Sequence, residues 1–312
     1  MKKRQITLSQ ALEGYVLYAE ARRLSPHTLR DYATTFIKFQ NFLDDDPPLI
    51  AIDAHQVQAF LAAQSHLKKK TVLNYRTGLS ALWTWAVSEG FIHDNVVHKT
   101  PAPKPEKVVI NPFTEQDVKL MLAACDRSRG YYVRPSQPEK CSRALPHPER
   151  NKAIIFTFLD TGIRNSELRK TAIADVDLKN KQMLVTGKGS KQRIVQLSSK
   201  TARAIWHYLT TRPEALDDDP LFTSNYEQNF TRQGLSRLIK NIGLRANVPN
   251  AHPHRFRHTF AITFLRNGGN IFVLQQLLGH STLDMVKHYL TLANQDSGAV
   301  HRRASPVANW NL

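Results

Sequence analysis

A set of basic side chains and one tyrosine occurs in a fixed order in the C-terminal half of the chain and could act together on a phosphodiester. Two arginines, one lysine and two histidines could neutralise a phosphate as it becomes pentacovalent, and the tyrosine could attack it. No acidic cluster suited to Mg²⁺ accompanies them, so the positive charge would come from side chains and not from a metal. The residues and their local sequences are Arg164 in TGIRNSEL, Lys188 in TGKGSKQR, His254 and Arg257 in HPHRFRHTF, His280 in LLGHS and Tyr289 in VKHYL.

Several of these positions have a chemical or geometric reason of their own. An arginine is well suited to position 164, because a planar guanidinium can hold two non-bridging phosphate oxygens and stays charged at any working pH. Lysine suits Lys188, which lies between two glycines, because its pKa shifts readily in a charged site and it can then act as a general acid. His254 and Arg257 are three residues apart, so both project from one face of a predicted helix.

These sequences, in this order over residues 164–289, resemble the simple two-domain members of the tyrosine recombinase (phage integrase) family. The resemblance covers about residues 6–292 and is weakest over residues 127–150. It implies a site-specific DNA recombinase that cuts and rejoins DNA through a 3′-phosphotyrosyl intermediate, without metal, ATP or another cofactor. Tyr289 would attack the DNA phosphate, and Lys188 would protonate the leaving 5′ oxygen. The added charge would be stabilised by Arg164, Arg257 and His280.

The same resemblance assigns roles to residues around this set. His254 would be an acid–base or hydrogen-bonding group. Glu167 would orient the cations of the site, although an acidic residue is also favourable in the first turn of a helix. The family interval after His280, in LGHSTLDMVKHY, favours Tyr289 over the neighbouring His288 as the nucleophile.

Other basic residues are candidates for contact with DNA. Lys191 and Arg193 would contact the DNA backbone, and the family alignment alone favours Lys188 over Lys191 as the general acid. Arg255 and His258 are expected to point away from the catalytic face of their helix, as backbone-contacting or structural residues.

The composition indicates a soluble protein of two domains. A length of 312 residues allows two cores, and 41% hydrophobic residues with a mean hydropathy of −0.40 fit a globular chain. There is no apolar run of about 18 residues and no signal peptide, so a cytoplasmic location without membrane contact is predicted. The spacing of Cys125 and Cys141 does not suit a zinc site and favours reduced thiols.

The net charge of +17 indicates a polyanionic partner, for which nucleic acid is the usual candidate. The charge is uneven along the chain. Residues 1–106 hold 13 Lys and Arg against 10 Asp and Glu, whereas residues 107–312 hold 30 against 16. Most of the positive excess therefore falls on the half that carries the proposed chemistry.

The predicted fold class is mainly α, and residues 1–106 predict four short helices. The phrase SPHTLRDYATTFIKFQNFL and this arrangement are similar to the SAM-like core-binding domain that clamps DNA in the family. Helical spacing places aromatic residues such as Phe36, Phe39 and Trp83 in the core. A run of three lysines begins the fourth helix, near residues 70–89, and is either a phosphate contact or a solvated surface. These lysines are Lys68, Lys69 and Lys70.

A proline-containing linker is predicted at about residues 99–111, before a mostly helical catalytic domain at 107–312. Two strands, at 182–186 and 192–197, would flank the GKGSK turn as a small antiparallel sheet. Residues 127–150 are basic, rich in proline and without periodicity, which fits either a disordered loop or a DNA-contacting insertion.

The resemblance also implies partners. The family works as a homo-tetramer on two double-stranded DNA sites. An accessory protein would set the direction of recombination. The tail at 293–312 would dock on a neighbouring protomer. Two alternative functions compete with this one. The core-binding phrase argues against a type IB topoisomerase, and the complete six-residue set argues against a catalytically inactive DNA-binding protein on the same fold.

Overall fold

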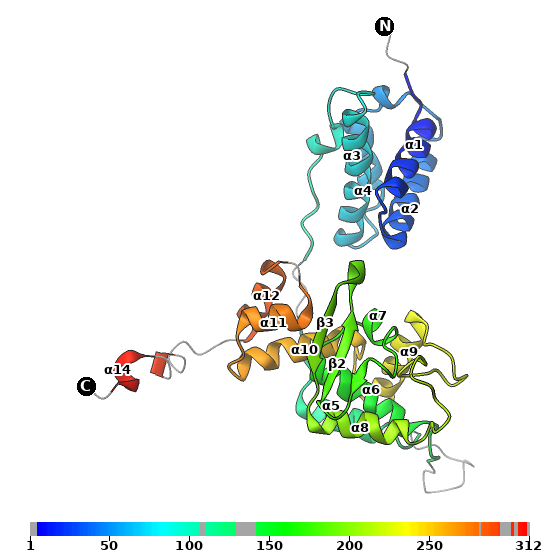
Figure 1. Cartoon of the computed structure of the whole chain (residues 1–312). Coiled ribbons are helices and arrows are strands. Elements are labelled where there is room, and N and C mark those ends of the chain that lie inside the picture. Colours follow the sequence, from blue (N-terminus) through cyan, green and yellow to red (C-terminus); the bar gives the residue numbers. More distant parts are fainter. Residues whose placement is uncertain are drawn as a thin grey trace, which may run out of the picture. The chain divides into compact units, whose positions relative to one another are not determined.

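The structure is a computed structural model, and the chain divides into two compact units, Met1–Val108 and Val109–Leu312 (Figure 1). It describes residues 5–106, 110–128, 142–280, 282–293, 301–302 and 305–310. No helix within these ranges is long and apolar enough to cross a membrane.

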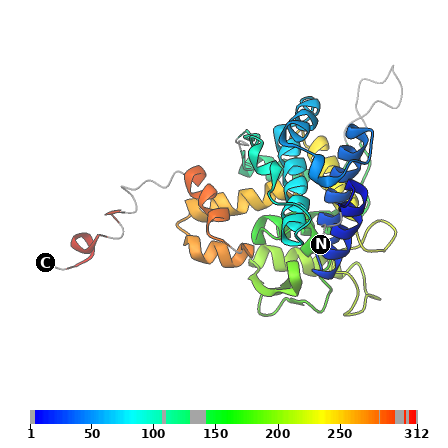
Figure 2. The same ribbon diagram turned by 90° about the horizontal axis from the view of Figure 1, so that it is seen from above.

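Within residues 5–106 the first unit consists of four α-helices, as the sequence predicts, and two short 3₁₀ turns (Figures 1 and 2). Ser25 caps α2 by accepting a hydrogen bond from the Thr28 amide, with Pro26 in the first turn. Asp53 and Gln56 form a reciprocal capping box at the start of α3. The helices are α1 Leu8–Ala21, α2 Pro26–Leu43, α3 Ala54–Ala63 and α4 Lys69–Ser88, and the turns are Leu49–Ala51 and Val96–Lys99.

The core of this unit is aromatic. Helix α4 packs against α1, α2 and α3, and Phe36, Phe39 and Trp83 are buried, which confirms the expectation from helical spacing. Phe39 meets Phe60 and Trp83 edge to face, with ring centroids 5.1 and 6.0 Å apart.

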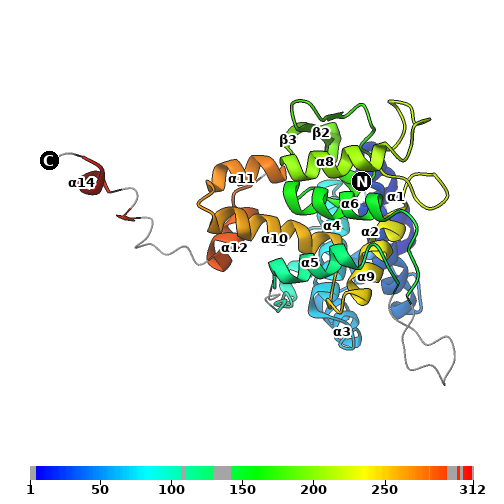
Figure 3. The ribbon, with the colours of Figure 1, turned by 90° about the horizontal axis from the view of Figure 1, so that it is seen from below.

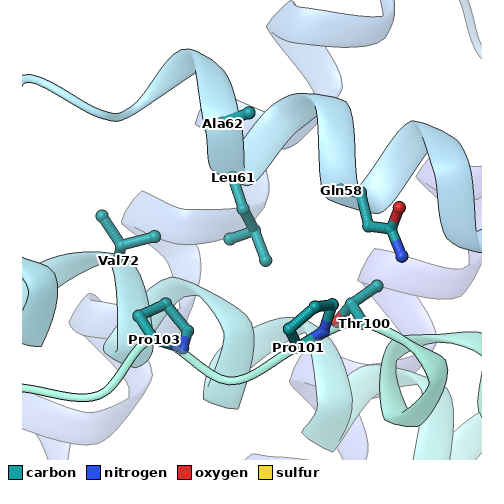
Figure 4. Close-up of a pocket in the computed structure, with 7 residues that line it drawn as sticks. All are labelled: Gln58, Leu61, Ala62, Val72, Thr100, Pro101 and Pro103. Atoms are coloured by element: carbon teal, nitrogen blue, oxygen red, sulfur yellow. The ribbon is translucent and has the colours of Figure 1, made fainter.

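The start of the predicted linker is held against this unit. The Arg76 guanidinium donates hydrogen bonds to the carbonyls of Val97 and Thr100. The next residues, including Pro101 and Pro103, face α3 and α4 across a small pocket (Figure 4). The first part of the predicted linker therefore packs against this unit. Residues 107–109 lie outside the described residues. The pocket is lined by Gln58, Leu61, Ala62, Val72, Thr100, Pro101 and Pro103.

The second unit is mostly helical and carries a small antiparallel sheet, which confirms the predicted fold class. Strands β1 Val176–Asp177, β2 Gln182–Thr186 and β3 Gln192–Gln196 are hydrogen-bonded in that order. Strands β2 and β3 pair on either side of the predicted glycine-containing turn, with Thr186 opposite Gln192. The two-residue strand β1 was not predicted. The helices are α5 Glu115–Ala123, α6 Pro148–Thr161, α7 Asn165–Leu168, α8 Ser199–Leu209, α9 Arg232–Arg245, α10 Pro253–Arg266, α11 Ile271–Leu278, α12 Asp284–Ala293 and α14 Pro306–Asn309.

Helix α10 is central to this unit, because it packs against α6, α11 and α12 (Figure 3). On one side its Phe256 is fully buried and contacts the rings of Phe113 and Phe158. Further along, Ala261, Ile262 and Leu265 join a second core with residues of α11 and α12. The helix is therefore fixed from several directions, which makes it a rigid support for functional side chains.

The two ends of the predicted insertion at 127–150 lie together. The Ser128 amide donates to the Arg143 carbonyl, and the Leu145 amide donates to the Asp126 carbonyl. The Arg127 guanidinium adds hydrogen bonds to Ser142. Residues 129–141, and with them the choice between a loop and a DNA-contacting insertion, lie outside the described residues.

Candidate active site

Arg257 occupies the centre of the candidate site. It lies on α10, is 3% exposed, and donates hydrogen bonds to the carbonyl oxygens of Gly162 (2.9 Å) and Leu278 (2.6 Å). Burial, followed by the positive charge of Arg164, lowers the pKa of Arg257 to about 10. The guanidinium is therefore still charged at neutral pH and is held in one orientation by the backbone.

The backbone around Gly162 requires glycine. This residue ends α6 in the left-handed region, with φ of 61°. A Cβ here would lie 2.4 Å from a ring carbon of Phe260. Glycine therefore lets the chain turn from α6 toward Arg164 while its own carbonyl accepts the hydrogen bond from Arg257.

The Glu167 carboxylate binds two arginines of the site, Arg164 and Arg193. Its carboxylate accepts hydrogen bonds from the Arg164 amide and guanidinium, each at 2.8 Å, and from Arg193 at 2.9 and 3.1 Å. The side chain is 2% exposed. Burial alone raises its pKa, but the hydrogen bonds from Arg193 and Arg164 outweigh this and lower the pKa to about 2. The predicted orienting role of Glu167 thus has a geometric basis, because its carboxylate is ionised and fully engaged.

Arg193 binds groups inside the protein. Its Nε donates to the Leu277 carbonyl at 2.7 Å, both terminal nitrogens bind Glu167, and its side chain is 14% exposed. The residue connects β3 to α7 and to the end of α11. These contacts hold Glu167 in place, and a contact of Arg193 with the DNA backbone stays a prediction.

His280 follows α11 and contacts Arg257. The Arg257 Nη2 lies 2.7 Å from His280 Nε2. Burial, then Arg257 and Arg164, lowers the pKa of His280 to about 4, so the ring is neutral at pH 7. Since arginine can only donate, Nε2 accepts and the ring proton is on Nδ1. That Nδ1 is buried and has no hydrogen-bond partner among the described residues.

Tyr289 faces α10 from α12. It is 5% exposed, and its hydroxyl lies 2.8 Å from Nδ1 of His258. Burial raises its pKa, and the charges of Arg257 and Arg164 act in the opposite direction. The neighbouring His288 is exposed, so the two candidate residues differ in their surroundings.

The position of His258 differs from the sequence expectation. It was expected to point away from the catalytic face, but it contacts the Tyr289 hydroxyl. The signal was available, because His258 lies four residues after His254 and positions i and i+4 share a helix face. The two imidazole rings are 5.8 Å apart. The pKa of His254 is lowered, first by desolvation and then by Arg257.

The remaining basic candidates divide by position. Lys188 begins the turn Lys188–Ser190 between β2 and β3, and its side chain lies outside what the structure describes. Lys191 is exposed at the end of this turn. Lys68, Lys69 and Lys70 are exposed at the start of α4, where Lys69 pairs with Glu106 at 3.5 Å.

Arg255 makes internal contacts, which fit the structural alternative that the sequence left open. Its contact with DNA stays a prediction. Its guanidinium donates to the carbonyls of Asn111 and Pro249 and lies 4.1 Å from the centre of the Phe113 ring. Its side chain is 14% exposed and lies 3.8 Å from Asp117. These contacts fasten the segment before α5 to α10.

The arrangement brings together Arg164, Glu167, Arg257, His280 and Tyr289 from four separate segments. Within the described part of the chain, no three His, Cys, Asp or Glu residues lie close enough to hold a metal ion. Arg164 and Arg257 bring positive charge to the site.

Comparisons with known proteins agree with this geometry. Residues 112–296 match the phage integrase family, and residues 12–90 match the phage integrase N-terminal SAM-like domain. The chain is 29% identical over 297 residues to tyrosine recombinase XerC from Thermodesulfovibrio yellowstonii, covering 91% of this chain and 92% of the relative. It is 30% identical over 280 residues to tyrosine recombinase XerD from Neisseria meningitidis serogroup B, covering 88% and 90%.

A solved structure shares the fold. A lambda integrase dimer bound to a COC′ core site aligns with a TM-score of 0.69 at 20% identity, over 90% of this chain and 97% of that chain.

Proposed function

Because this chain belongs to the phage integrase family and is a tyrosine site-specific DNA recombinase, we propose that Tyr289 is its nucleophile. The Tyr289 oxygen attacks the scissile phosphate, the bond to the 5′ oxygen breaks, and a 3′-phosphotyrosyl link keeps the bond energy for rejoining. One observation carries this proposal: Tyr289 is buried against α10, within the electrostatic influence of Arg257 and Arg164.

Arg164 and Arg257 bind the non-bridging oxygens in this proposal and stabilise the charge that grows on them. Arg257 is fixed by two carbonyl oxygens, so it needs no reorganisation when the phosphate becomes pentacovalent. Arg164 is 30% exposed and stays accessible to DNA, while its guanidinium donates a hydrogen bond to Glu167.

His280 supplies a neutral hydrogen-bond donor. With Nε2 engaged by Arg257, its Nδ1–H is the group left to donate to a phosphate oxygen. A buried donor without a partner is unfavourable. We infer that substrate satisfies it.

The other residues complete the reaction and the contact with DNA. Lys188 protonates the leaving 5′ oxygen from the β2–β3 turn, and His254 contributes a hydrogen bond beside the phosphate. Lys191 and the three lysines of α4 contact the DNA backbone, since they are exposed and phosphate contacts require accessible cations. These lysines are Lys68, Lys69 and Lys70.

Oligomerisation on DNA is proposed from structures with the same fold. Lambda integrase is known as a dimer on a core site and as a tetramer on a Holliday junction. We therefore propose a homo-tetramer on two double-stranded DNA sites in the cytoplasm, with residues 1–106 as the DNA clamp and 107–312 as the catalytic domain. The tail at 293–312 would dock on a neighbour, and an accessory protein would set direction.

Covalent capture tests the proposal. The purified protein is incubated with DNA flanking its own gene, without metal or ATP, and stopped with SDS. We expect a protein–DNA adduct for the parent and none for Tyr289→Phe, with both proteins equal in gel-shift binding. Specific binding without an adduct in the parent would contradict a recombinase and favour a protein that only recognises DNA.

A further inference from the structure

The hydroxyl of the proposed nucleophile has a polar partner in the structure. Its oxygen lies 2.8 Å from Nδ1 of His258, with the two ring centroids 5.7 Å apart. Both side chains come from packed helices, α10 and α12. The contact is therefore set by the fold and not by two mobile surface residues.

The direction of this hydrogen bond follows from its surroundings. Tyr289 is 5% exposed, so its hydroxyl hydrogen needs an acceptor inside the protein. The charged groups that act on it, Arg257 and Arg164, can only donate. His258 is neutral at pH 7 because burial, followed by neighbouring positive groups, lowers its pKa to about 4. Its Nδ1 accepts the phenolic hydrogen, and the ring hydrogen is on Nε2.

We propose that His258 is the proton acceptor for Tyr289 during DNA cleavage. As the bond between the Tyr289 oxygen and phosphorus forms, the phenolic proton moves to Nδ1 of His258. The bond from phosphorus to the 5′ oxygen breaks, and that oxygen takes its own proton from Lys188. On rejoining, His258 returns the proton to Tyr289. This inference rests on the proposed nucleophile and adds a catalytic residue to it.

The other histidines near the site are less suited to this step. Nε2 of His280 is already engaged by Arg257. His288 is exposed, and its ring centroid lies 6.5 Å from that of Tyr289. His254 has no hydrogen bond to the Tyr289 hydroxyl among the described contacts and is also exposed. Direct contact with the reacting oxygen favours His258.

The substrate makes His258 a better base. Burial is the largest effect that disfavours the charged form of His258. It is followed by the effects of His254, of His252 at the N-cap of α10, of Arg257 and of His288 on α12. A bound phosphodiester brings negative charge near Arg257 and so favours the charged form of His258 in the complex. This charge favours transfer of the proton to His258 when DNA is bound.

A substitution can separate holding the hydroxyl from taking its proton. In His258→Asn the amide oxygen can occupy the place of Nδ1 and accept the hydrogen bond, but it cannot take the proton. We expect single-turnover adduct formation to fall by about 10²-fold. His288→Asn is the matched control, since it removes a histidine beside Tyr289 that does not touch the hydroxyl, and should stay within about threefold of the parent.

The leaving group supplies a second test. A substrate with sulfur in place of the bridging 5′ oxygen needs no proton on departure, so it should restore Lys188→Ala and not His258→Asn. A more acidic fluorotyrosine at position 289 should instead restore His258→Asn, because that phenol loses its proton without a strong base. A merely structural role for His258 predicts neither pattern of rescue.

The outcomes separate this inference from the proposed function. Parent-like cleavage by His258→Asn, or its rescue by the sulfur substrate, would overturn the role of His258 and leave Tyr289 as the nucleophile. An adduct formed by Tyr289→Phe would overturn the proposed function itself. If His258→Asn does not bind DNA as the parent does, His258→Gln is carried through the same comparison.

Discussion

The aromatic core of the first unit and the polar cluster around α10 are both buried, but they bury opposite kinds of side chain. The first packs rings such as Phe39, Phe60 and Trp83 edge to face. The second buries a carboxylate and a guanidinium, Glu167 and Arg257, each nearly inaccessible to solvent. Burial of rings needs complementary shape, whereas burial of ions needs a partner for every charge.

The consequence is a difference in tolerance. An aromatic core can lose part of one ring and relax around the gap. In the polar cluster, removal of one partner leaves another charge buried and unpaired. Substitutions in the two regions should therefore differ in whether they impair stability alone or both stability and chemistry.

The largest effect is expected at Arg257. In Arg257→Lys one ammonium cannot reproduce the hydrogen bonds to Gly162, Leu278 and His280. Single-turnover cleavage should fall by about 10²–10⁴-fold. Quenched-flow measurement of adduct formation at saturating DNA checks this. A loss of less than tenfold would mean that charge alone is sufficient at this position.

A matched pair of substitutions sharpens the comparison of the two regions. Glu167→Ala and Trp83→Ala should each lower the free energy of unfolding by about 3–5 kcal/mol. Cleavage by folded Glu167→Ala should also be slow, because Arg164 loses its support. Cleavage by Trp83→Ala at saturating DNA should match the parent. Denaturant titration and single-turnover assays on both variants test this. Equal cleavage rates for Glu167→Ala and Trp83→Ala would contradict the difference between the two regions.

The same contrast explains what the sequence could predict. Helical spacing correctly placed Phe36, Phe39 and Trp83 inside, because the periodicity of apolar residues depends on local geometry. The order of the motifs predicted a catalytic set, and the structure brings Arg257 next to His280 and within electrostatic reach of Tyr289. The catalytic roles themselves stay a prediction. The partners of Arg193 and Arg255 were not predictable, because each binds groups far away in sequence, at Glu167 and at Asn111.

The pH dependence of stability is a further test of the buried cluster. In the folded state the pKa values of His258 and His280 are about 4, below the ordinary value near 6.5. Between these values the unfolded chain binds more protons, so stability falls as pH decreases from about 6.5 to 4. The loss should be on the order of 1 kcal/mol per histidine. In His258→Asn the free energy of unfolding, measured by denaturant titration, should depend less steeply on pH between pH 7 and 5. An unchanged dependence on pH would contradict the neutral state of His258.

Glu167 acts at lower pH. Its pKa of about 2 lies below the ordinary value of a glutamate. Its contribution to stability is therefore present above about pH 4.5 and is lost as pH falls toward 2.

The smallest effect is expected among the surface cations. Lys191→Ala should weaken DNA binding modestly and reduce the slope of log affinity against log salt by about 1, because one phosphate contact is lost. Arg255→Met should leave that slope unchanged and lower the melting temperature, because its contacts are internal. Salt-dependent binding titrations compare the two variants. A lower salt slope for Arg255→Met would restore it as a DNA contact.

The central claim is that Tyr289 becomes covalently attached to DNA, and peptide mapping of the adduct tests it most directly. The adduct formed on a nicked substrate would be digested with protease and nuclease, and the modified peptide sequenced by mass spectrometry. The account predicts a phosphotyrosine linkage at Tyr289, joined to the 3′ end of the cleaved strand, with a free 5′ hydroxyl on the other fragment. Attachment at His288, or a link to a 5′ phosphate, would contradict it.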